Sequence, residues 1–473
     1  MHNTLYTGDN LFFLRGLNSN SIDLIYLDPP FNTKTFYSAP IGTKAAGASF
    51  EDMWTWEEVD KYYLEQIIDH YPYLVQFIDA VDVINGEAMM SYVTYMAQRI
   101  IEMHRVLKDS GSFYLHCDPT ASHYLKIVCD RVFGKKNFRN EIIWKRIQGA
   151  GKKSQHSPKK WGASTDTILF YTKTNNFVLK PYRKYDKFEI LKKFPLTGEH
   201  GRYYDDTAHI FRSKSLGPRP NLCYTWKGFK NPNPSGWTLS KERLQEEYEK
   251  GNFVITETLT GPKLERRKYE KDHLGHSLNN FWEDIEAVSG DEDTGYPTQK
   301  PLKLLNRIIE ASSNEGDLIL DPFCGCATTL VSAQRSGRKW IGIDVEKKSS
   351  ELVMERLSEE GRLFDKFINT QDFPVRTDVE HLNIEDKDVK EKLYSDQKGK
   401  CNGCIDKLDI RHFEIDHIIP REKNGGDYYE NLQLLCGNCN RVKGNRPMAY
   451  LMWRISERNK LINKKIGFSK RTD

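Results

Sequence analysis

The sequence predicts a doubly wound α/β domain with a parallel sheet, followed by a small zinc-stapled domain near the C-terminus. Short apolar strands alternate with segments of helical periodicity, which is typical of a parallel sheet covered by helices. Three of these strands end on an aspartate, namely Asp28, Asp321 and Asp344, and such sheets bind ligands at these strand ends. Two closely spaced cysteine pairs predict the small domain. A chain of 473 residues is too long for one hydrophobic core, so two or three domains are expected.

The predicted elements of the large domain come in two groups. Residues 22–27 form a short apolar strand that Pro29 and Pro30 end abruptly. Residues 91–107 carry apolar side chains at helical spacing, and residues 112–116 form the next strand. The second group consists of a strand at 318–320, a helix at 328–335 and a strand at 340–343.

Composition sets the expected domain boundaries. The large domain is expected to span residues 1–364. Within it, residues from about 145 to 290 are rich in Gly, Pro, Asn and Lys and weakly periodic, which indicates an inserted, loop-rich region. The polar residues 365–397 are interpreted as a linker. The cysteine-rich domain then spans 398–446, and a basic tail covers 447–473.

The net charge of +4 conceals an uneven distribution. Residues 1–144 hold 12 Lys and Arg against 18 Asp and Glu, whereas residues 145–220 hold 17 against 6 and carry a net charge of +11. Aromatic residues lie between these cations: Trp144, Trp161, Phe170, Tyr171, Tyr182 and Tyr185, among Lys145, Arg146, Lys152, Lys153, Lys159 and Lys160. Cations with flat apolar faces suit a phosphate backbone and unstacked bases. The alternative is a solvated basic loop region.

Other features exclude several classes of protein. With 38% hydrophobic residues the chain can build cores, so wholesale disorder is not expected. No apolar run approaches the roughly 18 residues that a membrane span needs, and no secretory signal is visible. Nine cysteines, an odd number in a long chain, argue against a secreted disulfide scaffold and for a reducing, cytoplasmic setting.

The first group of functional residues is Asp28-Pro29-Pro30-Phe31, directly after a strand. The two prolines have no backbone N–H, so carbonyl oxygens there stay free to accept hydrogen bonds. A carboxylate beside a free carbonyl is a pure acceptor pair, which suits an exocyclic amino group. The Phe31 ring offers a stacking face for a planar base. Taken alone, the tetrapeptide is equally explained as a turn that ends a strand.

The second group is the segment 321–329, Asp-Pro-Phe-Cys-Gly-Cys-Ala-Thr-Thr, between a strand and a helix. Small residues in such a turn let the backbone approach a nucleotide-like ligand. Asp344, at the end of the next strand, could accept hydrogen bonds from ribose hydroxyls. The alternative is a tight turn needed only for packing. An alanine at position 327 is expected to be tolerated only if φ there is negative.

Together these groups resemble the amino-directed DNA methyltransferases of the circularly permuted β class, over roughly residues 3–360. The order of the groups is the same, and Gly8-Asp9, Asn140–Lys145 and Thr298-Gln299-Lys300-Pro301 also match. The resemblance implies a Rossmann-like sheet with an inserted target-recognition region, and S-adenosylmethionine as the cofactor. It assigns Asp28, Pro29, Pro30 and Phe31 to the target base, and Asp9, Lys300, Asp321, Phe323, Gly325 and Asp344 to the cofactor. In this class a second glycine usually stands at position 327.

The resemblance also implies a mechanism. The lone pair of an adenine N6 amino group is delocalised into the ring, and hydrogen bonds to the Asp28 carboxylate and the Pro29 carbonyl would localise it. They would hold the nitrogen in line with the methyl group, which is catalysis by position and electrostatics. The base must leave the duplex, with Phe31 as its stacking partner. Asp28 and Phe31 resemble adenine-N6 enzymes more than cytosine-N4 enzymes, and the alternative substrates are RNA or protein amides.

The C-terminal cysteines form two Cys-x-x-Cys pairs separated by 31 residues: Cys401, Cys404, Cys436 and Cys439. Two such pairs predict a tetrahedral Cys₄ zinc site. The other five cysteines have no such spacing and are interpreted as ordinary thiols.

The segment 400–446 inside and around this frame resembles the HNH endonucleases with a ββα-metal core. The resemblance assigns His417 as the general base that deprotonates water, and Asp416 and Asn440 as ligands of Mg²⁺ or a similar ion. It gives Asn431 the task of holding the His417 loop in shape. A histidine is commoner at position 440. The alternative is a zinc-stapled DNA-binding module in which His417 is only structural.

The whole chain is therefore predicted to be a bifunctional enzyme of double-stranded DNA, of prokaryotic or phage type. One part methylates adenine and the other hydrolyses phosphodiesters, as in restriction–modification. The runner-up is a solitary modification methyltransferase, adenine-N6 or cytosine-N4, whose HNH-like unit only binds DNA. A third class is a non-catalytic DNA-binding regulator. Relatives of the β class are often dimers, so a homodimer is expected, and no membrane partner is.

Overall fold

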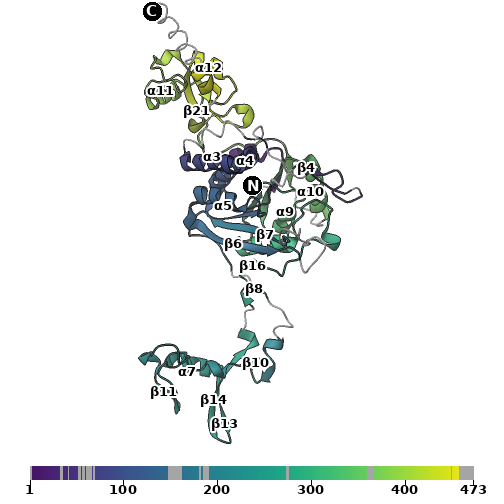
Figure 1. Ribbon diagram of the computed structural model, residues 1–473, viewed down its shortest axis with the longest axis vertical. Coiled ribbons are helices and arrows are strands. Elements are labelled where there is room, and N and C mark those ends of the chain that lie inside the picture. Colours follow the sequence, from purple (N-terminus) through teal and green to yellow (C-terminus); the bar gives the residue numbers. More distant parts are fainter. Residues whose placement is uncertain are drawn as a thin grey trace, which may run out of the picture. The chain divides into compact units, whose positions relative to one another are not determined.

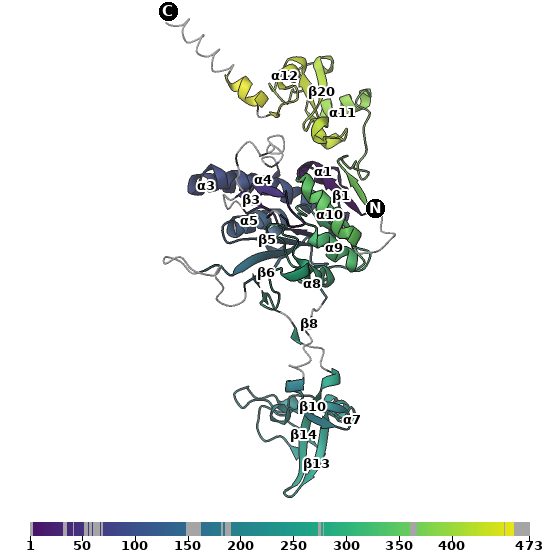
Figure 2. The same ribbon diagram turned by 90° about the vertical axis from the view of Figure 1, so that its right-hand side faces the viewer.

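The structure is a computed structural model of the full chain (Figures 1 and 2). The residues it describes are 3–31, 36–40, 42–51, 55, 59, 67, 70–147, 162–180, 183–184, 191–272, 276–277, 279–359, 367–448 and 450–457. Two compact units share them, one of residues 1–180 with 280–473 and one of Pro181–Asn279. Among these described residues, no helix combines the length and the apolar character needed to cross a bilayer.

A nine-stranded sheet organises the first unit, in the order β16-β6-β7-β5-β2-β17-β18-β1-β19. Every neighbouring pair is parallel except the two that β7 makes with β5 and β6. The predicted α/β class is confirmed, with one antiparallel strand added. The strands are β1 (Thr4–Thr7), β2 (Ile22–Leu27), β5 (Leu107–Cys117), β6 (Phe138–Lys145), β7 (Thr165–Thr172), β16 (Phe281–Trp282), β17 (Leu318–Asp321), β18 (Lys339–Asp344) and β19 (Ile368–Thr370). A separate hairpin pairs β3 (Phe36–Ser38) with β4 (Ser49–Glu51).

Helices cover both faces of this sheet, because its central strands are apolar on both sides (Figure 2). In β2, Ile25 and Leu27 pack into one core cluster, whereas Leu24 and Tyr26 pack into the other. The first cluster includes residues of α1 (Asn10–Gly16), α3 (Pro72–Asn85), α4 (Glu87–Val106) and α5 (Ser122–Cys129). The second includes residues of α8 (Leu302–Ser312), α9 (Thr328–Arg335) and α10 (Lys347–Glu359). Period-2 alternation along β2 thus joins two helical layers to one sheet.

The predicted elements of both groups are present. The strand at 22–27 and the helix at 328–335 have the predicted bounds, and the helix predicted at 91–107 begins earlier, at Glu87. The strand predicted at 112–116 is longer, since β5 starts at Leu107. Periodicity located these elements because each one buries a continuous apolar face.

The inserted unit is smaller than the region 145–290 that composition predicted. Strands β7 and β16 belong to the main sheet, so the unit that packs on its own spans only Pro181–Asn279. It contains the sheet β13-β14-β10-β9 and helix α7 (Lys241–Glu249), drawn in teal in Figure 1. Trp226 and Trp237 lie in its core. Its strands are β8 (Arg183–Lys184), β9 (Leu196–Gly198), β10 (Gly201–Asp205), β11 (Thr225–Trp226), β12 (Phe229–Lys230), β13 (Phe253–Thr258), β14 (Gly261–Tyr269) and β15 (His276–Ser277).

The interpretation of three aromatic residues as faces for unstacked bases is wrong. Trp144, Phe170 and Tyr171 are at most 2% exposed, because they belong to β6 and β7 and fill the cores of the main sheet. A cation-rich sequence can still be a sheet strand when its alternate side chains are apolar. The remaining members of that pattern, Lys152, Lys153, Lys159, Lys160, Trp161, Tyr182 and Tyr185, lie outside the described residues.

The segment 365–397, predicted as a linker, contains regular structure. Strand β19 pairs with β1 at the edge of the main sheet. Helix α11 (Lys387–Asp396) buries Val389 and Leu393 in the core of the cysteine-rich domain. That domain also contains β20 (Phe413–His417), β21 (Leu432–Cys436) and α12 (Gly437–Lys443). Leu451 joins the same core, so the domain extends beyond both predicted bounds.

The backbone at Ala327 contradicts the predicted negative φ. Ala327 has φ 66° and ψ 24°, the left-handed conformation, at the N-cap of α9. This conformation lets the turn after β17 lead directly into the helix, at a cost of roughly 1–2 kcal/mol for a residue with a Cβ.

We therefore expect Ala327→Gly to leave the stability unchanged or to raise it by up to about 1 kcal/mol, since glycine adopts this conformation freely. The matched control is Ala333→Gly inside α9, which should cost about 1 kcal/mol or more because Ala333 is a buried helical residue. Midpoints of thermal unfolding measure both. Equal losses in the two variants would contradict the strain at position 327.

Candidate functional site

Four aspartates meet at the carboxyl edge of the main sheet. The strands β2, β17, β18 and β1 are consecutive neighbours and all parallel. Asp321 and Asp344 end β17 and β18, and Asp28 and Asp9 follow β2 and β1 closely. Their carboxylates line a cavity of about 590 Å³, within the range usual for small-ligand sites. Pro29, Pro30, Phe31, Tyr296, Lys300, Phe323 and Gly325 also line it.

The Asp28 carboxylate is held from one side only. The Lys300 ammonium donates a hydrogen bond to Oδ2 of Asp28. The other oxygen, Oδ1, is buried and accepts no hydrogen bond from the described residues. Phe31, also part of the cavity wall, lies with its ring 6.1 Å from the His116 ring, at an interplanar angle of 29°. The Asp28 loop therefore offers a free carboxylate oxygen next to an aromatic face.

Asp9 has two structural partners as well as its place in the cavity. Its Oδ1 caps α1 by accepting from the backbone N–H of Leu11 at 2.9 Å. The same oxygen forms an ion pair at 2.6 Å with Arg99, whose side chain is 1% exposed. A side chain with two such partners is fixed in direction, so Asp9 is presented to the cavity in one orientation.

Asp321 and Asp344 lack a basic partner among their described contacts, and their burial shows in their acidity. Burial raises the pKa of Asp321 to about 7 and that of Asp344 to about 6, although backbone N–H donors lower both. Asp344 accepts from the N–H of Gly325 at 2.8 Å and from that of Glu346 at 2.9 Å. A Cβ at Gly325 would lie 3.1 Å from the Tyr296 ring, so a glycine is needed where the loop comes this close to Tyr296.

Sequence reasoning missed a buried polar chain behind the Asp28 loop. The Tyr26 hydroxyl lies 2.9 Å from Nδ1 of His116, and Nε2 of His116 lies 3.2 Å from Asp166. Arg146 completes the chain with an ion pair of 3.0 Å to Asp166. Burial alone would raise the pKa of Asp166, but the hydrogen bond from His116 and the neighbouring positive charges lower it. Tyr26 and His116 look like ordinary strand residues in the sequence, so no signal marked them.

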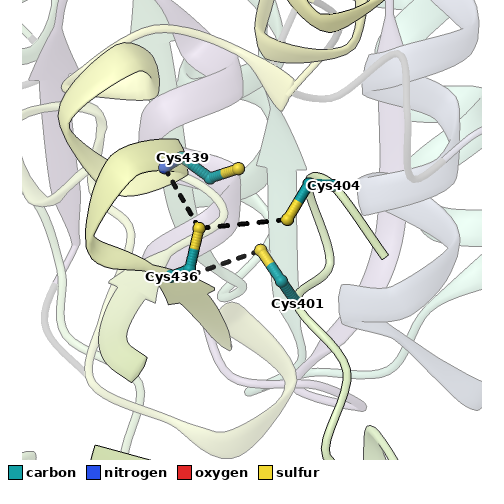
Figure 3. Close-up of side chains that lie close together, drawn as sticks. All are labelled: Cys401, Cys404, Cys436 and Cys439. Atoms are coloured by element: carbon teal, nitrogen blue, oxygen red, sulfur yellow. Dashed lines mark hydrogen bonds between the residues drawn. The ribbon is translucent and has the colours of Figure 1, made fainter. Parts of the chain in front are cut away.

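The four cysteines of the C-terminal frame come together as predicted (Figure 3). Their sulfur atoms lie within 4.8 Å of one another, and Sγ of Cys404 is 3.9 Å from Sγ of Cys436. A zinc–sulfur bond of about 2.3 Å gives a tetrahedral edge of about 3.8 Å, so the cluster fits a zinc ion. Backbone N–H groups of Cys436 and Cys439 point at sulfurs of Cys401 and Cys436, at 3.2 and 3.4 Å. Such donors stabilise thiolates in metal sites.

The residues predicted to hold a second metal ion have other partners. The Asp416 carboxylate accepts from Lys443 at 3.0 Å and from Gln433 at 2.8 Å. The Lys443 side chain is 1% exposed and also donates to the carbonyl of His417. The Asn440 amide donates to Glu414 at 2.6 Å. An ammonium already neutralises the carboxylate, so this arrangement does not fit a divalent ion, and the assignment of Asp416 and Asn440 as its ligands is not met.

His417 lies beside these residues in a cavity of about 410 Å³. Its Nε2 is 2.6 Å from Oδ1 of Asp427, a carboxylate that Arg421 also holds, at 2.6 Å. Asn431 is 1% exposed and bridges the loop after His417: its oxygen accepts from the N–H of Ile419, and its amide donates to the carbonyls of Ile419 and Gly426. Asn431 therefore occupies the loop-holding place that the sequence assigned to it.

Two further functional side chains were not singled out from the sequence. Tyr296 lines the cavity two residues before the Thr298–Pro301 segment, and Asp427 follows the Gly425-Gly426 pair. Each stands next to a recognised motif, and that neighbourhood is the one signal that could have identified it. Lys443 was expected to hold DNA phosphates, and its ammonium instead lies at the Asp416 carboxylate.

Comparisons with known proteins identify both the large domain and the C-terminal domain. The DNA methylase family model matches residues 22–355, and the HNH endonuclease model matches residues 401–446. The Type II methyltransferase M.EcaI of Enterobacter cloacae is 30% identical over 286 residues, which cover 59% of this chain and 60% of that protein. The Type III restriction-modification enzyme StyLTI Mod subunit of Salmonella typhimurium is 25% identical over 350 residues, 69% of this chain and 49% of that protein.

A third relative, the DNA adenine methyltransferase YhdJ of Escherichia coli, is 25% identical over 357 residues, 75% of this chain and 82% of that protein. The chain spans 60% and 49% of the lengths of the first two relatives. The first family model covers well over half of the 473 residues, including Asp28, Asp321 and Asp344 of the acidic cavity. The chain therefore belongs to the DNA methylase family and carries a C-terminal HNH domain.

Proposed function

We propose that the large domain transfers a methyl group from S-adenosylmethionine to the N6 amino group of an adenine in double-stranded DNA. The observation that carries this proposal is the buried Oδ1 of Asp28, which has no hydrogen-bond partner among the described residues and belongs to the same cavity-lining loop as Phe31. An acceptor in that place takes a hydrogen bond from an exocyclic amino group and localises its lone pair. The Pro29 carbonyl supplies the second acceptor, and Phe31 stacks on the extruded base.

The cavity fits the proposed cofactor by charge and by shape. S-adenosylmethionine, when bound, supplies an electrophilic methyl group on a positively charged sulfonium. Carboxylates of Asp321 and Asp344 line the cavity that would receive its positive charge and its ribose hydroxyls. Phe323 and Gly325 line the same cavity, where the Tyr296 ring packs close to the loop because Gly325 has no side chain. Asp9, fixed by Arg99, completes the acidic wall.

Adenine is the proposed base, with cytosine N4 as the alternative. Asp28 and Phe31 are the residue types that resemble adenine-N6 enzymes, and one relative is itself described as a DNA adenine methyltransferase. Modified-base sequencing of DNA from cells that express the protein tests the proposal, because it reports the base, the position and the sequence motif together. N6-methyladenine at a fixed motif, lost with Asp28→Asn, is the expected result. N4-methylcytosine would show that the assigned base is wrong.

Cofactor affinity should depend on pH through the two carboxyls with raised pKa. Asp344, with a pKa of about 6, and Asp321, with a pKa of about 7, are neutral at pH 5 and ionised at pH 8. We expect the affinity for the cationic cofactor to rise over this window, as measured by calorimetric titration, and to rise less in Asp344→Asn. The protons that Asp321 and Asp344 bind at low pH also stabilise the ligand-free fold, because burial raises both pKa values above those of the unfolded chain. This contribution is complete below pH about 4 and is lost as the pH rises through 6 to 7, so the ligand-free melting temperature should fall there.

The inserted unit and its flanks are the proposed contact with DNA. Within the unit, Arg266, Arg267 and Lys268 follow one another on β14. Asp206 forms ion pairs with Arg266 and Lys268 at 3.3 and 3.2 Å, and Arg267, on the other face of the strand, pairs with Glu265 at 2.9 Å. Basic side chains on a twisted hairpin suit a phosphate backbone. A homodimer is proposed from the resemblance alone, and light scattering of the purified protein would test it.

We further propose that the HNH domain hydrolyses DNA, which would make the chain a restriction–modification enzyme. The observation that favours this is the 2.6 Å contact between His417 and Asp427 in an open cavity. A carboxylate on one ring nitrogen fixes the imidazole and leaves the other nitrogen to take a proton from water. Because the residues around Asp416 do not fit a divalent ion as they stand, no step is derived through one.

Purified protein incubated with unmethylated plasmid and a series of divalent metals tests the nuclease proposal. We expect nicks or breaks that disappear in His417→Ala and fall strongly in Asp427→Asn. The matched control is His412→Ala, an exposed histidine directly before the strand that ends at His417, which should cut normally. Plasmid that stays intact with every metal would favour the alternative, an HNH domain that only binds DNA.

A further inference from the structure

We propose that Lys300 is a positioning residue for Asp28, and that it directs the free oxygen of Asp28 at the amino group of the target base. The sequence resemblance assigned Lys300 to the cofactor instead. The inference rests on the proposed function and deepens it, because it names a residue that sets the geometry of the proposed catalytic carboxylate.

The contacts of Lys300 carry the proposal. Its side chain is 9% exposed, and its ammonium donates to Oδ2 of Asp28 and to the carbonyl of Thr298, the latter at 3.2 Å. The ammonium also lies 5.7 Å from the centre of the Phe31 ring. All three partners belong to the Asp28 loop or to the segment that carries Lys300. Its described partners include none of the other three cavity aspartates.

The conformation of the backbone just before Lys300 helps to hold the Lys300 side chain in its position. Thr298 has φ 69°, and positive φ is rare for a β-branched residue. This conformation costs free energy and needs support from its surroundings. In this case it turns the Thr298 carbonyl to the Lys300 ammonium. The side chain of Gln299, between the two, is anchored by Thr294, whose hydroxyl lies 2.6 Å from the Gln299 oxygen, so the whole segment is held in place.

Charge explains why Asp28 needs such a partner. Four carboxylates line one cavity, and like charges at short range disfavour ionisation. Arg99 compensates Asp9, and Lys300 compensates Asp28. Asp321 and Asp344 have no such partner among the described residues and carry raised pKa values. The ammonium therefore places a positive charge at the Oδ2 oxygen of the Asp28 carboxylate.

Geometry gives the ammonium a second effect. A carboxylate bound at Oδ2 cannot rotate freely, so Oδ1 keeps one direction. That oxygen is the buried one without a described partner. A fixed acceptor requires no reorganisation when the reaction occurs, and this is the source of most electrostatic catalysis.

The test compares Lys300→Met, Lys300→Arg and the control Lys303→Met in the full-length protein. Lys303 is exposed, lies in α8 three residues after Lys300, and donates to the carbonyl of Asp284 at 2.7 Å. Cofactor affinity is measured by calorimetric titration with S-adenosylmethionine. Single-turnover methylation uses saturating cofactor and an oligonucleotide with the motif found by sequencing.

For Lys300→Met we expect the methylation rate to fall about 10²-fold while the cofactor dissociation constant changes less than about threefold. Lys300→Arg should restore part of the rate. Lys303→Met should behave as the wild type. A cofactor dissociation constant raised tenfold with an unchanged saturated rate would overturn the proposal and return Lys300 to the cofactor.

A double-mutant cycle separates this inference from the proposed function. Lys300→Met, Asp28→Asn and the double variant are compared by melting temperature without cofactor or DNA. Coupled residues give non-additive shifts, and additive shifts would overturn the pairing whether or not the enzyme methylates adenine. If the wild type shows no methyl transfer while the shifts are non-additive, the proposed function fails and the pairing stands.

Discussion

Asp28→Asn should lower the methylation rate about 10²- to 10³-fold while the cofactor dissociation constant changes less than about threefold. The expected decrease in rate has the size usually found when one preorganised electrostatic group is removed from an active site. Asparagine has the same shape, but it loses the charge that polarises the amino group and its ion pair with Lys300. The amide also carries N–H donors, which would face the N–H groups of the base.

The matched control for this variant is Asp23→Asn. Asp23 belongs to β2, the strand that ends directly before Asp28, and it is not among the residues that line the cavity. It pairs with Lys108 at 2.8 Å and accepts from the N–H of Leu318. We expect it to lower the melting temperature and to leave the saturated rate unchanged. Quenched-flow or filter-binding assays with labelled cofactor measure both rates. An Asp28→Asn enzyme with a wild-type rate would exclude Asp28 as the acceptor for the amino group.

Loss of the four-sulfur site should unfold the C-terminal domain. Among the described residues its core has nine buried members, two of which are the cysteines Cys401 and Cys439, and small domains of this kind obtain much of their folding free energy from the metal. Apparent zinc-binding free energies in such domains are about 10–16 kcal/mol. Cys401→Ser should therefore release the zinc, and protease sites between residues 387 and 457 should become accessible.

Elemental analysis of the purified protein and limited proteolysis measure this outcome. The wild type should contain about one zinc per chain, and a strong chelator should reproduce the effect of Cys401→Ser. Cys223→Ser is the control, because Cys223 is exposed and lies in the inserted unit. A wild-type protein that resists proteolysis without bound metal would show that the apolar core alone is sufficient.

Particular elements show how much of the fold could be predicted from the sequence. The helix at 328–335 and the strand at 22–27 were predicted with their observed bounds, because each one buries an apolar face that leaves its own periodicity. The prediction of a linker at 365–397 was wrong. Helix α11 buries just Val389 and Leu393, so its sequence shows only a weak apolar periodicity. Trp144, Phe170 and Tyr171 were misread because a basic composition outweighed the alternation of β6 and β7.

The candidate site shows the same division. Asp28, Asp321 and Asp344 were singled out because they end strands, and strand ends in a parallel sheet share one edge. The pairing of Asp28 with Lys300 joins residues 272 positions apart, and neither spacing nor composition contains that information. The same holds for Lys443, whose ammonium lies at the Asp416 carboxylate that a divalent ion was expected to use.

By itself, the amino-acid sequence determined the α/β class, the four-cysteine frame and the aspartates at the strand ends. These are local properties: each depends on periodicity or on spacing within a few dozen residues. The tertiary structure alone decided which aspartate is paired, which carboxylate oxygen stays free and which cysteine sulfurs meet at the edge length of a zinc tetrahedron. Those outcomes depend on how separate segments pack, because burial and opposite charges act between atoms that only the folded chain brings together.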